Sequence, residues 1–123
     1  MAYKLRDEKG YVLLNQFENN DNWKAHYKTT GPELWDATHK TITHFVATMG
    51  TTGTIMGTSK FLKEQNKEIV IVGAQPAEGA KIPGIRKWSP EYVPKFFDKS
   101  RVDITIDVTE EAAKTTTKLF VGF

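Results

Sequence analysis

The stretch from residue 43 to residue 74 constrains the fold most, because a strand, a turn, a helix and a second strand follow one another without long joints. Residues 43–49 and 69–74 have the apolar character of strands, and residues 54–65 have the apolar spacing of a helix. The second strand is apolar almost throughout, which is typical of a strand covered on both faces. Such a βαβ unit requires parallel pairing and a right-handed crossover. The sequence therefore predicts an α/β fold on a partial parallel sheet.

Other segments extend this pattern. Residues 102–108 alternate apolar and polar side chains, which predicts a half-buried third strand near a sheet edge. Thr109 precedes two glutamates and starts a last helix over residues 109–120. We expect this helix and the helix at 54–65 to pack on the sheet. A short strand is expected near residues 11–15, and helices are expected from Trp23 and from Glu33.

Composition excludes several classes of protein. The 123 residues carry a formal charge of +2, and no basic block has interleaved aromatic residues, so no nucleic-acid partner is indicated. No apolar run approaches membrane-spanning length, so no membrane partner is expected. No leader is visible, so a cytoplasmic location is expected. There is no cysteine, which fits a reducing compartment. The histidines His26, His39 and His44 lack metal-site spacing, so no metal is expected.

The turn Gly50-Thr51-Thr52-Gly53-Thr54 carries the strongest chemical signal. It leaves a strand and enters a helix, where free backbone N–H groups and the helix dipole favour an anion. It matches neither the dinucleotide-binding fingerprint nor the P-loop, which require other glycine and lysine spacings. The turn is interpreted as a phosphate-binding turn, with simple helix capping as the alternative.

Short motifs in a fixed order extend along most of the chain. They are Gln16-Phe17, Thr29-Thr30-Gly31-Pro32-Glu33-Leu34-Trp35, Gly50-Thr51-Thr52-Gly53-Thr54-Ile55, Val72-Gly73-Ala74-Gln75-Pro76 and Ile82-Pro83-Gly84-Ile85. Together they resemble the cysteine synthases, or O-acetylserine sulfhydrylases, which are pyridoxal-phosphate enzymes of fold type II. The doubled threonine of the turn and the segment 83–88 resemble the B-type enzymes more than the A-type.

This resemblance implies a role for each motif. Residues 50–54 would hold the phosphate of pyridoxal phosphate, and Gln16 and Phe17 would contact the amino-acid substrate. Gly84 belongs to a loop that would close over that small-molecule substrate. Arg86, with Lys87 beside it, would face an anionic sulfur donor, although a solvated charged loop remains the alternative. Residues 1–17 would be a remnant of the small domain, its last strand, and residues 18–123 a partial large domain.

The same resemblance implies that part of the catalytic machinery is missing. The family's reaction is a β-replacement on O-acetylserine by sulfide or thiosulfate, and it needs a lysine that binds the cofactor covalently. Neither that lysine nor the Ser/Thr-Gly-Asn-Thr loop occurs here, and Lys60 is interpreted as an exposed helix lysine. We therefore expect no catalytic residue and no activity from this chain alone, which resembles an internal fragment. The alternatives are a phosphate-binding or pyridoxal-phosphate-binding remnant, and a chain that associates with itself or with a complementary segment.

Overall fold

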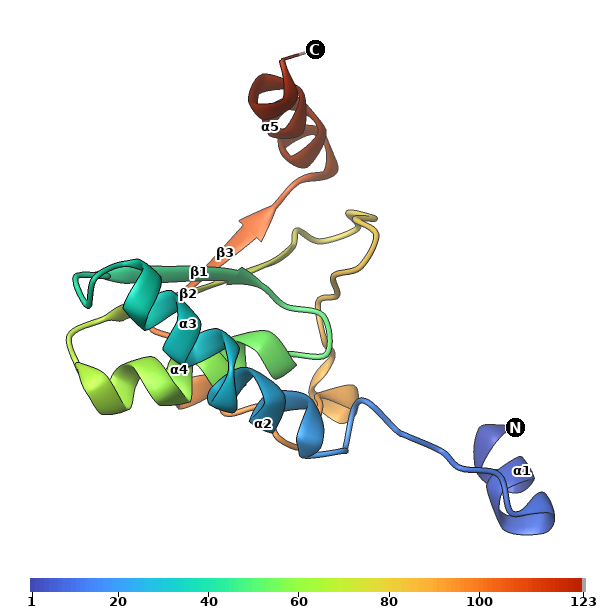
Figure 1. Cartoon of the computed structure of the whole chain (residues 1–123). Helices are drawn as coiled ribbons and strands as arrows, with labels where there is room; N and C mark the ends of the chain where they lie inside the picture. Colours follow the sequence, from blue (N-terminus) through green and yellow to red (C-terminus); the bar gives the residue numbers. More distant parts are fainter. Residues whose placement is uncertain (123) are drawn as a thin grey trace.

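A computed structural model describes residues 1–122 as a small α/β unit with a helix projecting at each end (Figure 1). The elements, in chain order, are α1 (Ala2–Lys9), α2 (Asp21–Lys28), α3 (Thr30–Ala37), β1 (His44–Thr48), α4 (Gly53–Gln65), β2 (Val70–Pro76), the 3-10 turns η1 (Pro90–Tyr92) and η2 (Lys99–Arg101), β3 (Ile104–Val108) and α5 (Glu110–Val121). Within residues 1–122, no helix is long and apolar enough to cross a membrane.

The sheet has three strands in the order β1-β2-β3, and both pairings are parallel. Val46 of β1 is level with Val72 of β2, and Val72 is level with Ile104 of β3. The α/β class and the parallel pairing are therefore confirmed, and β2 is the central strand. The three strands end at the same edge, which is where the turn into α4 lies.

The core lies between the sheet and α4. Its fully buried side chains come mainly from these two elements, and α2 and α3 pack against the other side of α4. The contiguous cluster of buried apolar residues comprises Met49, Ile55, Met56, Leu62, Ile69 and Ile71. Burial of a side chain of this size stabilises the fold by about 1.5–3 kcal/mol. The βαβ unit, with α2 and α3 outside it, is consequently the ordered centre of the chain.

The prediction of a strand near residues 11–15 is wrong. Residues 2–9 form helix α1, and residues 11–15 belong to no helix or strand and form no ladder with any described strand. Val12 and Leu14 are mostly exposed. Strand formation depends on a neighbour that accepts the backbone hydrogen bonds, and apolar sequence alone does not supply one. Figure 1 shows this connection leading from α1, which stands apart, to the start of α2.

The prediction that the last helix packs on the sheet is also wrong. Helix α5 forms, and Thr109 caps it by accepting a hydrogen bond from the N–H of Ala112 at 3.1 Å. However, α5 has no buried residue, and Figure 1 shows it standing beyond the end of β3 rather than against the sheet. Ile104 and Ile106 of β3 are correspondingly about half exposed. The apolar spacing of β3 and α5 predicts faces to be buried, but no described residue covers them.

Candidate functional site

The turn between β1 and α4 leaves the N-terminus of α4 without a side-chain cap and without an acidic residue. Thr52 occupies the cap position, but its side chain makes no capping hydrogen bond, and the first turn of α4 holds no acidic residue. Helices α2, α3 and α5 each carry an acidic side chain there, whereas α1, like α4, carries none. Among residues 1–122, no acceptor pairs with the backbone N–H of Gly50, Thr51 or Thr52. The start of α4 therefore has the positive end of a helix dipole and free donors.

Thr52 is the most distinctive residue of the turn. Its φ is 68°, in the left-handed region that β-branched residues rarely adopt. The residue is 3% exposed, and its hydroxyl is buried with no hydrogen-bond partner among the described residues. Such a hydroxyl costs free energy until a ligand or solvent pairs with it. Thr52 lines a cavity of about 680 Å³ together with Gln75 of β2 and Thr105 of β3.

Thr51 is held from the side by helix α2. The amide Nδ2 of Asn22 donates to Thr51 Oγ1 at 3.1 Å and to the carbonyl of Gln16 at 2.7 Å. Gly53 has no room for a side chain, because a Cβ there would collide with the amide of Asn22. One asparagine thus joins the Gln16-Phe17 motif to the turn.

Thr54 is the exposed member of the turn. Its Oγ1 lies 3.4 Å from His26 Nε2, and His26 Nδ1 lies 2.9 Å from the hydroxyl of Thr30 in α3. His26 therefore bridges the start of α4 and the start of α3.

The segment that follows β2 returns to the same turn. The N–H of Arg86 donates to the carbonyl of Met49 at 2.9 Å, and Trp88 Nε1 donates to the carbonyl of Gly50 at 2.7 Å. A Cβ at Gly50 would lie only 2.7 Å from the carbonyl oxygen of Gly84. Gly50 is thus required for the close approach of this segment.

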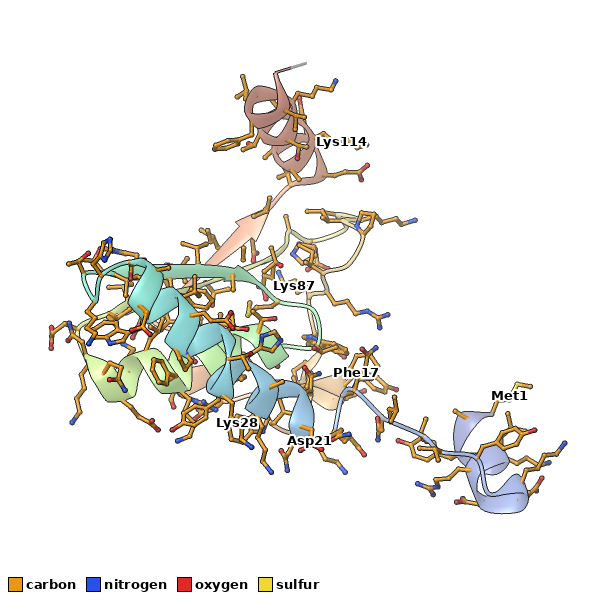
Figure 2. All side chains as sticks on the ribbon, in the orientation of Figure 1. Met1, Phe17, Asp21, Lys28, Lys87 and Lys114 are labelled. Carbon is orange, nitrogen blue, oxygen red and sulfur yellow. The ribbon has the colours of Figure 1, made fainter. Side chains whose placement is uncertain are left out.

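Arg86 and Phe17 meet beside the turn. The guanidinium of Arg86 lies 5.8 Å from the Phe17 ring centroid and 5.6 Å from that of Trp88, and the two rings pack edge to face. Figure 2 shows Phe17 where the N-terminal connection reaches the segment after β2. Cations over aromatic faces are held in place without losing their charge. Arg86 therefore keeps a positive charge close to the Gln16-Phe17 motif.

Lys87 does not join this group. Its Nζ lies 3.1 Å from Asp107 and 3.7 Å from Glu78, so it pairs with β3 and with the loop after β2. The hydrogen bond to Asp107 raises the pKa of Lys87 above its ordinary value. Of the two cations named in this segment, Arg86 alone lies beside Phe17. Lys60 pairs with Glu64 at 2.8 Å on the surface of α4, as expected for a helix lysine.

The structure brings the residues named from the sequence into one region. Backbone or side-chain contacts join all of them around the start of α4: Gly50, Thr51, Thr52, Gly53, Thr54, Gln16, Phe17, Gly84 and Arg86. Sequence reasoning missed Asn22. Its position six residues after Gln16, at the start of a helix, was the available signal. Within residues 1–122, no group of three His, Asp or Glu side chains could hold a metal ion.

Comparisons with known proteins agree with the resemblance read from the sequence. A family model described as pyridoxal-phosphate dependent enzyme matches residues 1–121. Cysteine synthase B of Pseudomonas aeruginosa is 55% identical over 114 residues, which are 93% of this chain and 38% of that protein. Cysteine synthase B of Escherichia coli is 55% identical over 116 residues, 94% of this chain and 38% of that protein.

Solved structures give the same result at the level of the fold. The crystal structure of O-ureido-L-serine synthase superposes with a TM-score of 0.88 at 28% identity, covering 98% of this chain and 41% of that one. A cysteine synthase from Entamoeba histolytica gives a TM-score of 0.85 at 29% identity, covering 99% and 38%. The chain therefore spans about 38% of the length of the curated relatives that it matches.

Proposed function

This chain belongs to the pyridoxal-phosphate dependent enzyme family, and from that premise we propose that its turn at residues 50–54 holds the phosphate of pyridoxal phosphate. The proposal rests above all on Thr52, whose hydroxyl is buried and unpaired at the bare start of α4. A phosphate fits this position because free N–H groups, hydroxyls and a helix dipole all favour an anion. The chemistry of the donor set is thus that of a phosphate site.

We further propose that the complete protein to which such a segment contributes is a cysteine synthase. Its reaction would replace the acetate of O-acetylserine by sulfide or thiosulfate, and two relatives that are 55% identical to this chain are named cysteine synthase B. The cofactor, when bound, supplies the electron sink for this replacement. The described residues would bind and orient the cofactor and the substrate. In this proposal residues 1–17 belong to a small domain and residues 18–123 to part of a large one.

The substrate side of the site is proposed to involve Gln16, Phe17, Gly84 and Arg86. Gln16 and Phe17 are tied to the turn through Asn22, and Gly84 is tied to it by close contact with Gly50. Arg86 sits over the Phe17 ring. A guanidinium held there favours an anionic group, such as the carboxylate of an amino acid or an anionic sulfur donor. In this proposal Arg86 supplies a positive charge on the side from which a substrate would approach.

For the chain alone we propose phosphate binding without catalysis. The sequence holds no Schiff-base lysine motif of the family, and Lys60 is engaged with Glu64 on the surface of α4. A phosphate turn built from local backbone needs only β1, α4 and the segments that touch them. Binding of pyridoxal phosphate through its phosphate is therefore separable from turnover.

Binding of paired ligands tests this proposal. Pyridoxal phosphate and inorganic phosphate should each raise the melting temperature of the chain, and they should compete, because both use the turn. Pyridoxal, which lacks the phosphate, should give a much smaller rise. Thr52→Val, which keeps the shape and removes the hydroxyl, should weaken both phosphate ligands. Equal effects of pyridoxal and pyridoxal phosphate, or no effect of Thr52→Val, would contradict the proposal.

A further inference from the structure

The side chain of Asn22 forms hydrogen bonds both to the turn at residues 50–54 and to the Gln16-Phe17 motif. We infer that Asn22 is a positioning residue, which orients the Thr51 hydroxyl as a donor to a bound phosphate and fixes the Gln16 segment beside it. This inference rests on the proposed function, because it names a positioning group for that same phosphate site. Asn22 itself does not have to touch the ligand.

The direction of each hydrogen bond follows from the chemistry of the partners. The Gln16 carbonyl can only accept, so the NH₂ end of the Asn22 amide must face it at 2.7 Å. The second hydrogen of the same nitrogen is then available for Thr51 Oγ1 at 3.1 Å. Both hydrogens are used by acceptors, which fixes the orientation of the amide.

This orientation has a consequence for Thr51. A hydroxyl has one hydrogen to donate and two lone pairs to accept with. Thr51 Oγ1 accepts from Asn22 and lies 3.4 Å from the backbone N of Gly53, also a donor. Its own hydrogen is therefore not used by these neighbours. Asn22 thus makes Thr51 a donor, which is the polarity that a phosphate oxygen requires.

The packing of α2 on α4 explains how Asn22 reaches the turn. Gly53 and Gly57 lie one helical turn apart on the face of α4 that meets α2. A Cβ at Gly57 would collide with the carbonyl of Trp23, and a Cβ at Gly53 would collide with Asn22 itself. The two glycines therefore let the backbones approach closely enough for a short amide side chain to bridge them. The start of α2 is built against the start of α4.

The connection to Gln16 couples the two halves of the proposed site. Residues 11–15 form no ladder, so nothing in a sheet holds this segment in register. The Asn22–Gln16 bond and the bond from the N–H of Lys95 to the carbonyl of Phe17, at 3.3 Å, are backbone restraints on the Gln16-Phe17 motif. Loss of Asn22 should therefore affect both the turn and this motif.

Inorganic phosphate, titrated calorimetrically into the 123-residue chain, is the probe for this role. Asn22→Ala should weaken phosphate binding roughly tenfold, the effect of a lost or misdirected charge-assisted hydrogen bond. Thr51→Val should weaken it similarly, and the double variant should be no weaker than Thr51→Val alone, because Asn22 acts through Thr51. Asn20→Ala is the matched control: its amide oxygen accepts from Trp23 Nε1 at the start of the same helix. That control should bind phosphate as the unaltered chain does.

Backbone amide resonances separate the failure of this inference from the failure of the proposed function. Without ligand, Asn22→Ala should shift the amides of Thr51, Gly53 and Phe17, and Asn20→Ala should leave them in place. If the unaltered chain binds no phosphate, both the proposed function and the positioning of a ligand by Asn22 are contradicted. If the unaltered chain binds phosphate and Asn22→Ala binds equally well, or if the two losses simply add, only the role of Asn22 is overturned.

Discussion

The indole Nε1 of Trp88 donates a 2.7 Å hydrogen bond to the backbone carbonyl of Gly50. These residues are far apart in the chain, and the bond closes the segment after β2 onto the turn at residues 50–54. The Arg86–Met49 backbone bond lies beside it, and Gly50 has no Cβ that would push the Gly84 carbonyl away. The segment after β2 and the turn therefore form one unit, so a change in either should affect the other.

Trp88→Phe tests this connection. The variant keeps an aromatic ring against Phe17 but removes the donor to Gly50, so we expect it to destabilise the chain by about 1–2 kcal/mol. Urea unfolding measures the change. Trp35→Phe is the control, because Trp35 belongs to the core and its indole N–H makes no hydrogen bond among the described residues. If both variants lose the same stability, the Trp88–Gly50 bond contributes nothing of its own.

Gly57→Ala tests the close packing of α2 on α4. Alanine favours a helix over glycine by about 1 kcal/mol, which alone would stabilise α4. The added Cβ would collide with the Trp23 carbonyl and lie 2.8 Å from the Cβ of His26, both parts of an adjacent helix. Overpacking of this kind costs about 1–3 kcal/mol or more, so the variant should be less stable. A melting temperature equal to or above that of the unaltered chain would contradict this packing.

Asp103 should make stability depend on pH. Its carboxylate pairs with Lys63 at 2.8 Å and accepts from the N–H of Ile71 at 2.7 Å, and these bonds, chiefly the one from Lys63, lower its pKa below the ordinary value of 3.8. A lowered pKa in the folded state means that the stabilisation is complete above pH 3.8 and disappears as pH falls through the folded-state pKa below it.

Asp103→Asn isolates this contribution. The variant should be less stable than the unaltered chain at neutral pH, and the difference should shrink once the pH falls below the ordinary aspartate pKa. Urea midpoints measured from neutral pH to about pH 3 follow the difference. Asp36→Asn, an exposed residue on α3, should show no such convergence. A difference that stays constant to the lowest pH would show that the charge of Asp103 is not responsible.

The apolar end of α5 should cause association. Leu119 is 78% exposed and Phe120 is 88% exposed, and no described residue lies over them. Contiguous exposed apolar side chains of this kind favour contacts with another chain. Sedimentation velocity should show a mass that rises with protein concentration, and Leu119→Glu with Phe120→Glu should reduce it. Thr116→Glu on the same helix is the control, and equal association of all three chains would contradict a role for this surface.

Much of the central unit could be predicted from the sequence, because its signals are local. The apolar runs at β1 and β2, the helix between them and the glycine-threonine turn are recognisable by spacing alone. The failures come from segments whose structure depends on neighbours. Residues 11–15 are apolar enough for a strand but have no partner, and α5 has an apolar face without a surface to cover.

The candidate site was likewise predictable only where its signals are local in the sequence. The residues of the turn were identified because a strand, glycines and a helix start follow one another. Asn22 was not identified, because its role depends on the crossing of α2 and α4. Two glycines of α4 permit this crossing, and no pattern in α2 itself encodes it. The pairing of Lys87 with Asp107 likewise depends on the return of the chain beside β3.

The most direct measurement is a titration of the ¹⁵N-labelled chain with inorganic phosphate, followed by its backbone amide resonances. The account predicts saturable shifts concentrated on the amides of residues 50–55, because those N–H groups point to the bound anion. The start of α5 is the internal control, since Thr109 caps it and Glu110 and Glu111 repel an anion. Absence of saturable shifts at residues 50–55, or equal shifts at the start of α5, would contradict the central claim.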